Sequence, residues 1–316
     1  MKDDTPEVSV VMSVYNAADY LETAIQSILT QENVSLELIV IDDGSTDGSP
    51  DILRRLAKDD NRVRLFVQAN AGLTLSLIYG CQLARGEFIA RQDADDVSLP
   101  DRLRKQRDSL KADESLAFVS CNAIYMGPND EMLEQIIRPT DPVEATRQLL
   151  FEETGPPAHG SVMMRRTSYE FVGGYREQFY FAQDSDLWLR LGRVGQIKYL
   201  PETLYAWRVS PSGISTLRQA QQLRFGDLGH ACHAAVLRGD SESKYLNQAA
   251  ELSRTIRHEK QQPSRLCARA KAWGHYRIGT TLARQGDSRA RDYFWQTIKS
   301  QPWHVRAWIR LFQSCL

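Results

Sequence analysis

Short apolar runs alternate with segments of helical spacing over the first 91 residues, and this alternation restricts the fold more than any other feature. The apolar runs are Val8–Val14, Leu36–Ile41, Val63–Val67 and Glu87–Arg91, each of strand length. Between the first two, apolar residues recur every three or four positions from Leu21 to Leu29. Because repeated strand–helix units build a parallel sheet with helices on both faces, we expect an α/β fold.

Three of these strands end in polar turns. Tyr15 and Asn16 follow the first strand, Asp42 and Asp43 end the second, and an acidic segment at 93–96 follows the fourth. Ligands of open α/β sheets bind outside the carboxyl ends of the strands. The sequence therefore predicts that the three turns line one crevice.

The acidic segment places three carboxylates, Asp93, Asp95 and Asp96, within four positions. Clustered carboxylates repel one another and are costly to desolvate. A hard cation offsets that repulsion, and oxygen ligands suit Mg²⁺ or Mn²⁺. The alternative is a solvated acidic turn before the helix that Pro100 opens.

The second half of the chain changes character near residue 215. Before that point we expect strands at 116–125, 161–164, 197–200 and 204–209, with helices at 141–151 and 184–194. After it strand signals vanish, which predicts two domains, 1–215 and 216–316. The second is all helical, and its residues 278–302 loosely match one tetratricopeptide-type hairpin.

The bulk composition excludes several classes of protein. A net charge of -1 gives no basic excess for nucleic acid. The five cysteines are scattered without a paired spacing, which favours a reducing cytoplasm over disulfides. No apolar run reaches the ~20 residues of a membrane span, and residues 1–6 lack the apolar stretch of a signal peptide.

The order and spacing of six motifs resemble glycosyltransferase family 2, whose members have the GT-A nucleotide-sugar fold. The resemblance covers roughly residues 7–215. The segments that carry it are 8–16 (VSVVMSVYN), 41–47 (IDDGSTD), 70–72 (NAG), 84–96 (ARGEFIARQDADD), 172–175 (VGGY) and 182–188 (AQDSDLW).

The resemblance assigns four residues to the nucleotide sugar. Ser13, Tyr15 and Asp43 match positions that hold the base. Tyr15 is expected to stack on it, and the Asp43 carboxylate to accept its ring N–H, which favours uracil, thymine or guanine over cytosine. Asp93 is expected to contact the ribose or the donor sugar. Asp42, which precedes Asp43, is interpreted as structural instead.

The resemblance also implies a metal ligand and a base. Asp95 is expected to coordinate the Mn²⁺ or Mg²⁺ ion that bridges the donor diphosphate, and Asp184 matches the catalytic base. The alternative for Asp184 is a helix N-cap, because it lies just before an amphipathic helix. Asp186 is its nearest rival and is interpreted as a first-turn helix acid.

Several residues keep two interpretations. Leu77 and Ile78 stand where many relatives have an Arg-Asn pair, so the identity of the donor sugar cannot be inferred from those relatives. Arg102 lies at a position that recurs in the family, but we assign it no chemical role. His159 could contact acceptor or diphosphate, or bond to its own loop. Arg208 could pair with the diphosphate or be a surface arginine.

The helical tail has alternatives of its own. Asp227, His230 and His233 share one helical face, where a solvated surface is favoured over a metal site. The segment 303–316 either packs on neighbouring helices or lies at a membrane interface. By elimination, the acceptor loops are 127–140 and 152–160.

The sequence thus predicts an inverting, metal-dependent glycosyltransferase. It would move a sugar from a nucleoside-diphosphate sugar, with UDP favoured, to an acceptor hydroxyl in cell-surface polysaccharide, glycolipid or glycoprotein synthesis. We expect it in the cytoplasm, with a peripheral membrane or protein contact through the helical tail. The alternatives are a non-catalytic nucleotide-sugar-binding scaffold and a sugar-phosphate nucleotidyltransferase.

Overall fold

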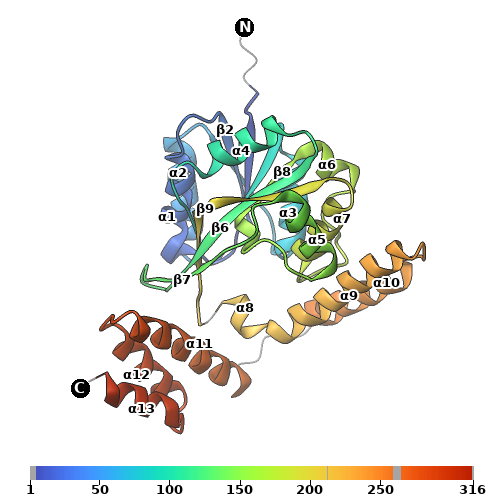
Figure 1. Ribbon diagram of the computed structural model, residues 1–316. Helices are drawn as coiled ribbons and strands as arrows, with labels where there is room; N and C mark the ends of the chain where they lie inside the picture. Colours follow the sequence, from blue (N-terminus) through green and yellow to red (C-terminus); the bar gives the residue numbers. More distant parts are fainter. Residues whose placement is uncertain (1–4, 212, 259–264, 315–316) are drawn as a thin grey trace.

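A single mixed sheet lies at the centre of the molecule, with helices on both faces and further helices below it (Figure 1). The computed structural model describes residues 5–211, 213–258 and 265–314. We call residues 5–211 the sheet region and the described residues from 213 onward the helical region. The predicted α/β class is confirmed, and helices follow the last strand as expected.

The elements follow the predicted order closely. The strands are β1 Val8–Val14, β2 Leu36–Asp42, β3 Val63–Val67, β4 Phe88–Asp93, β5 Val97–Ser98, β6 Leu116–Met126, β7 Met132–Ile136, β8 Met163–Arg165 and β9 Gln196–Arg208. The helices of the sheet region are α1 Ala18–Leu29, α2 Ser49–Asp59, α3 Leu73–Gln82, α4 Arg102–Ala112, α5 Pro142–Phe151, the 3₁₀ turn η1 His159–Ser161, α6 Arg166–Phe171 and α7 Gln183–Gly192. Those of the helical region are α8 Ile214–Leu217, α9 Gln219–Leu237, α10 Ser243–His258, α11 Arg265–Arg284, α12 Ala290–Ser300 and α13 Val305–Gln313.

The strand order across the sheet is β3-β2-β1-β4-β8-β6-β9-β5, with β7 paired to β6. The first four strands along the chain are parallel to one another. Strand β8 then runs antiparallel to both β4 and β6, whereas β9 is parallel to β6. The strand order therefore places β4, which carries the acidic segment at its end, in the middle of the sheet.

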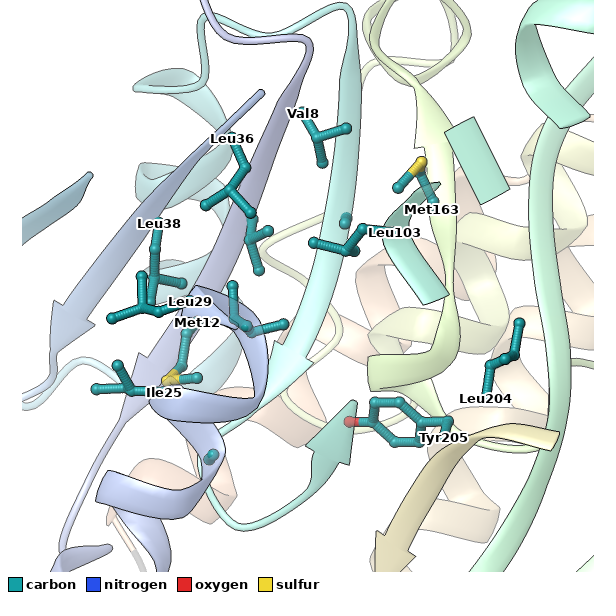
Figure 2. Close-up of a cluster of buried hydrophobic side chains, with 14 of the residues drawn as sticks. Val8, Met12, Ile25, Leu29, Leu36, Leu38, Leu103, Met163, Leu204 and Tyr205 are labelled. Carbon is teal, nitrogen blue, oxygen red and sulfur yellow. The ribbon is translucent and has the colours of Figure 1, made fainter. Parts of the chain in front are cut away.

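Alternate side chains of the central strands feed two separate cores. Val10 and Met12 of β1 face α1, α2 and α4, whereas Val11 faces α3 on the other side. Figure 2 shows part of the first core, with Met12 beside Ile25 and Leu29 of α1. Fully burying one such side chain contributes about 1.5–3 kcal/mol. Burial on both faces explains why these strands are apolar throughout.

Three local expectations need correction. The two strands expected at 197–200 and 204–209 are one strand, β9, whose pairing with β6 shifts register between Leu200 and Thr203. The first expected acceptor loop, 127–140, contains strand β7. Residues 167–170 have the Thr-x-x-Glu spacing from which we expect a capping box. That box does not form, because α6 has Arg165 at its N-cap and no side-chain cap bond.

The helical region contacts the sheet region at two places. Helix α9 packs on α7, and the Ser253 hydroxyl of α10 donates to the Gln178 carbonyl at 2.6 Å. Helices α11 and α12 cover the β6–β7 hairpin, where Leu133 lies in one core with Ile278 and Phe294. The predicted boundary near residue 215 lies between β9 and α9 and remains a prediction.

Candidate active site

Strand register brings the three predicted turns together at one edge of the sheet. Ser13 of β1 lies opposite Ile41 of β2 on one side and Asp93 of β4 on the other. Neighbouring strands are about 4.8 Å apart. The polar residues that follow β1, β2 and β4 therefore meet within a few ångströms, although they are far apart in the sequence.

Tyr15 is an exposed residue at this edge of the sheet. It is 52% exposed just after β1, so its ring is free to accept a flat partner. The next residue, Asn16, has φ 52° and accepts the Thr46 N–H on its side-chain oxygen at 2.7 Å. That bond ties the turn after β1 to the turn after β2 and fixes where Tyr15 stands.

Asp43 is only 2% exposed, and its carboxylate forms hydrogen bonds with the residues around it. Its carboxylate accepts the backbone N–H groups of Ala71 and Gly72, both at 2.8 Å, and the side-chain amide of Gln68 at 2.7 Å. A carboxylate has about four acceptor positions, so about one is left for a nucleotide base. Asp42 has the structural role given as its alternative, since it accepts the Ser45 N–H at 3.0 Å.

The acidic segment after β4 divides into one structural carboxylate and two that face the site. Asp96 is buried and accepts the Tyr205 hydroxyl at 2.8 Å and the Arg208 N–H at 2.7 Å. Asp93 is partly exposed and pairs with Arg91, whose guanidinium also donates to the Val11 carbonyl. The acidic turn is therefore solvated only in part, at Asp93 and Asp95.

Asp95 has the donor chemistry that a hard cation needs. Its loss of hydration, with the negative charge of Asp93 nearby, raises the pKa of its carboxyl to about 6. A bound cation would offset both causes. Within the described ranges, no three His, Cys, Asp or Glu side chains form a group able to hold a metal ion. An ion here would therefore take most of its ligands from phosphate and water, as Mg²⁺ does.

Helix α7 carries Asp184 in its first turn. Ala182 is the N-cap residue, so Asp184 is not the cap, and its carboxylate accepts only the N–H of the next residue, Ser185, among the hydrogen bonds of the described chain. Desolvation, reinforced by the charge of Asp93, raises the pKa of the Asp184 carboxyl. Asp184 is therefore near enough to Asp93 of β4 for their charges to interact, and its carboxylate accepts one hydrogen bond within the described chain.

Asp186, the rival of Asp184, is committed to the fold. It is buried and forms ion pairs with Arg190 at 2.6 Å and Arg176 at 3.3 Å. Each of its two carboxylate oxygens is therefore already paired with a guanidinium group. The interpretation of Asp186 as a first-turn helix acid fits this geometry.

His159 bonds to a side chain rather than to its own loop. Its Nε2 lies 2.6 Å from the Tyr175 hydroxyl, and its ring meets Trp188 edge-on at 6.0 Å between centroids. Desolvation, with the positive charge of Arg91, holds the pKa of His159 well below its usual range. His159 is thus a neutral ring that packs against Trp188 of α7 and bonds to Tyr175.

Two arginines that the sequence left open are buried structural residues. Arg102 donates to the Gly160 carbonyl at 2.6 Å and to the Arg91 carbonyl at 3.1 Å. Arg208 donates to the Asp95 carbonyl at 2.7 Å, pairs with Asp130 at 2.7 Å and lies 4.1 Å from the Tyr20 ring centroid. The surface-arginine alternative for Arg208 is wrong, because its side chain is 1% exposed.

Tyr205 is the site residue that sequence reasoning missed. Besides its bond to Asp96, its hydroxyl accepts the Asp93 N–H at 3.4 Å. It packs so closely on Gly160 that a Cβ there would lie 1.7 Å from the hydroxyl oxygen. Tyr205 sits inside an apolar strand pattern, and nothing in that pattern distinguishes it from a core tyrosine.

A cavity of about 310 Å³ is lined in part by Ser185, the residue that follows Asp184 in the chain. Ser185 and Trp188 of α7 form one wall, and the second expected acceptor loop supplies Gly155. Helix α9 adds His230, whose Nδ1 lies 3.7 Å from a Glu153 carboxylate oxygen. The face expected to be solvated is so only in part: Asp227 is exposed and His230 is partly buried. His233 is buried and donates to the Leu150 carbonyl.

Comparison with known proteins bears on this geometry. The model of the family described as "Glycosyl transferase family 2" matches residues 9–173, just over half of the chain. The chain belongs to this family. A relative from Bacillus subtilis named "Putative glycosyltransferase EpsE" is 35% identical over 208 residues, which is 64% of this chain and 73% of EpsE. The chain is accordingly a family 2 glycosyltransferase.

Solved structures support the same fold. The mannosyltransferase PcManGT from Pyrobaculum calidifontis superposes with a TM-score of 0.57 at 21% identity, over 97% of this chain and 87% of that one. Residues 1–349 of TarS from S. aureus give 0.53 at 16% identity, over 93% and 89%. At such identities the likeness shows the fold, which is the GT-A type expected of family 2.

The family resemblance predicts that the β4 edge is the donor side, and that role remains a prediction. Leu77 is fully buried and Ile78 packs beside it in the second core, so neither offers a polar contact. The individual roles of Ser13, Tyr15, Asp43, Asp93, Asp95 and Asp184 remain predictions from the family resemblance.

Proposed function

We propose that this chain is an inverting, divalent-metal-dependent glycosyltransferase. It transfers a sugar from a UDP-linked donor to an acceptor hydroxyl in cell-surface polysaccharide, glycolipid or glycoprotein synthesis. The observation that supports this most concerns Asp184. Its carboxylate accepts one hydrogen bond among the described residues, from Ser185, and has a raised pKa to which the charge of Asp93 at the end of β4 contributes. The remainder of the donor side is polar, and its open aromatic ring is Tyr15.

Each carboxylate would take a separate task. Asp93 contacts the ribose or the donor sugar, with Arg91 fixing its orientation. Asp95 holds Mn²⁺ or Mg²⁺, which neutralises charge on the departing diphosphate when bound. The Asp95 main chain is in turn fixed by Arg208 through its carbonyl. Ser13 and Tyr15 hold the base, with Asp43 beside them.

Asp184 would act on the acceptor. As the acceptor oxygen bonds to the anomeric carbon, the bond from that carbon to the diphosphate oxygen breaks, and the diphosphate leaves with the electron pair. The hydroxyl proton passes to the Asp184 carboxylate. A raised pKa makes that carboxylate a better proton acceptor near neutral pH. Attack from the side opposite the diphosphate inverts the anomeric centre, as with the base of inverting glycosidases.

The cavity lined in part by Ser185 is the proposed acceptor pocket. Its volume is at the lower end of the range for small-molecule sites. Ser185 follows the proposed base directly, and Trp188 stands one helical turn further on the same face. Arg138 and Glu153 provide a hydrogen-bond donor and an acceptor, which suits a sugar bearing several hydroxyls.

Two solved structures support the choice of donor class. PcManGT was determined with GDP-Man and Mn²⁺, and TarS with UDP-GlcNAc. Uracil and guanine both offer a ring N–H, as the Asp43 hypothesis requires. We propose a cytoplasmic location, with the helical region as the contact to a membrane or protein; no helix in the described ranges is long and apolar enough to cross a bilayer.

A thermal-shift panel tests the donor. The protein is melted with UDP-, GDP- and dTDP-sugars, each with Mn²⁺ and with EDTA. Because a ligand stabilises the native state by about 2.7 kcal/mol at a hundredfold excess over its Kd, we expect the largest rise with a UDP-sugar and Mn²⁺. A rise that EDTA does not diminish would contradict the role of the cation.

Product analysis separates the alternatives. We expect the protein to release nucleoside diphosphate from the stabilising donor when acceptor glycosides are added. Pyrophosphate release from a nucleoside triphosphate and a sugar phosphate would instead identify a nucleotidyltransferase. Donor binding with no release to any acceptor or to water would identify a non-catalytic scaffold.

A further inference from the structure

Helix α13 presents an open apolar stripe. Val305, Trp308, Ile309 and Phe312 follow one another at spacings of three, one and three residues and are 67%, 48%, 51% and 70% exposed. That spacing places them on one side of the helix. The opposite side is already used, because Ala307 is buried and Leu311 packs on the core of α11 and α12. Packing within the hairpin therefore accounts for only one of the two apolar sides.

The stripe continues onto neighbouring elements. Trp295 of α12 meets Trp308 edge-on, with centroids 6.3 Å apart. Trp303, 88% exposed, lines an open cavity of about 460 Å³ together with Trp273 of α11 and Val305. We call these seven residues the aromatic face: Trp273, Trp295, Trp303, Val305, Trp308, Ile309 and Phe312.

The charge around the aromatic face is one-sided. Residues 268–314 contain nine Lys and Arg and two acidic residues, a net charge of +7 in a chain whose total is -1. No Asp or Glu occurs from Tyr293 to the end of the sequence. Arg269 and Arg306 line the same cavity as Trp303, and Lys299 stands 5.8 Å from the Trp295 ring centroid. None of these three cations has a carboxylate partner among the described residues.

This combination of chemistry fits a lipid surface best. Basic residues are attracted to anionic headgroups, and tryptophan rings settle at the boundary between headgroups and acyl chains. Single-stranded nucleic acid also binds basic and aromatic surfaces, but through rings that stack on bases. Val305 and Ile309 cannot stack, whereas they can enter an acyl layer. We propose that the aromatic face docks on a bilayer rich in anionic phospholipid.

The placement of α13 is compatible with docking. It lies on the side of the α11–α13 hairpin away from the sheet (Figure 1). The hairpin is fastened to the β6–β7 turn, where the Tyr293 hydroxyl donates to Glu131 at 2.7 Å and the Gln285 amide donates to the Leu133 carbonyl at 3.0 Å. Docking would thus hold the sheet region near a membrane.

Vesicle co-sedimentation tests the proposal on the full chain. We compare vesicles of equal parts phosphatidylglycerol and phosphatidylcholine with vesicles of phosphatidylcholine alone. Binding is expected to the first only and to weaken as salt is raised, because screening shortens the reach of the charges. The double variant Ile309→Gln/Phe312→Gln should bind roughly tenfold more weakly, since it removes exposed apolar groups that would enter the bilayer.

Matched variants control for fold and charge. Val67→Gln/Phe171→Gln changes two similarly exposed apolar residues of the sheet region, at 69% and 79%, and should bind like the unmodified chain. Arg306→Glu/Arg310→Glu should abolish binding, whereas Arg54→Glu/Arg55→Glu makes the same charge change on α2 and should retain most of it. Thermal melting with nucleotide sugar should be unaltered in the α13 variants, which separates this proposal from the glycosyltransferase function.

Several outcomes would overturn the proposal. These are an absence of sedimentation with anionic vesicles, or equal binding by the α13 variants and their controls. Two other results would assign the surface elsewhere. Binding of a fluorescent single-stranded oligonucleotide in place of vesicles would make it a nucleic-acid surface, and a dimer in light scattering that the Ile309→Gln/Phe312→Gln variant dissociates would make it a self-association surface.

Discussion

The sheet region buries charged side chains, whereas the helical region gathers exposed tryptophans on one face. Arg91 and Arg102 are fully buried below the donor edge and donate to backbone carbonyls. In contrast, Trp303 and Phe312 stand largely in solvent. A buried charge is tolerated only where partners are fixed in advance, so the first pattern indicates a preorganised site. An exposed apolar stripe indicates a surface that another body covers.

The two regions also differ in charge. Residues 268–314 carry +7, which leaves -8 on the remainder of the chain. The sheet region places three acids at the end of β4, where a cation is expected to bind, and the helical region spreads its bases over a surface. Because these two charges nearly cancel in the total of -1, the overall charge does not predict a basic surface.

The largest expected effect concerns the proposed base. Asp184→Asn should lower kcat by about a thousandfold, within the range for removal of a general base, and leave donor-induced thermal stabilisation unchanged. The kcat is measured from product release, and the thermal stabilisation is measured by melting with nucleotide sugar. Activity within tenfold of the unmodified enzyme would exclude Asp184 as the base.

Asp186→Asn is the matched control, two residues away on the same helix. Its loss leaves Arg190 and Arg176 without the carboxylate that pairs with both. Breaking a buried pair in this way costs about 3–5 kcal/mol, so this variant should melt early while Asp184→Asn does not. Equal melting of the two variants would remove the distinction between a functional and a structural carboxylate.

The second prediction addresses the cation. Asp95→Asn should remove most of the extra stabilisation that Mn²⁺ gives in the presence of a nucleoside diphosphate, and reduce activity by about a hundredfold, comparable to the loss of other metal-site groups. Without ligand it should melt no earlier than the unmodified protein, because the desolvated Asp95 carboxylate is itself unfavourable. Full Mn²⁺-dependent stabilisation in this variant would place the ion elsewhere.

The third prediction concerns pH. Because the pKa of Asp184 is raised, activity should fall about tenfold for each pH unit below that pKa, where the base is protonated. The folded carboxyl holds its proton more tightly than the unfolded one, so its contribution to stability is present at low pH and lost as pH rises through the folded pKa. Asp184→Asn should therefore raise the melting temperature at pH 7 but not at pH 4. Equal effects at both pH values would contradict the raised pKa.

The smallest effect tests how firmly the two regions are joined. Tyr293→Phe removes a hydroxyl bonded to Glu131, a carboxylate that is 1% exposed, and to Asn129. The buried Glu131 would lose a partner, at a cost of about 1–3 kcal/mol. Calorimetry should show the loss in the unfolding of the helical region, with donor binding intact. Tyr276→Phe, whose ring is in the same hairpin, provides the control.

Much of the donor side could be predicted because its signals are local. An apolar strand followed by a polar turn is visible in a few consecutive residues, as at Val8–Asn16 and Phe88–Asp96. Parallel strands then bring their carboxyl ends to one edge. The α/β fold and the family were therefore readable, and the structure and comparisons confirm both.

Sequence alone determined which side chains end the strands and which helical segments are apolar. Tertiary structure decided what each side chain meets: that Asp184 comes near enough to Asp93 for their charges to interact while Asp186 is held by two arginines, that Tyr205 and Arg208 fix the acidic turn, and that α13 leaves one apolar side uncovered. The physical reason is that backbone periodicity depends on near neighbours, whereas burial and pairing depend on residues brought together only when distant elements pack.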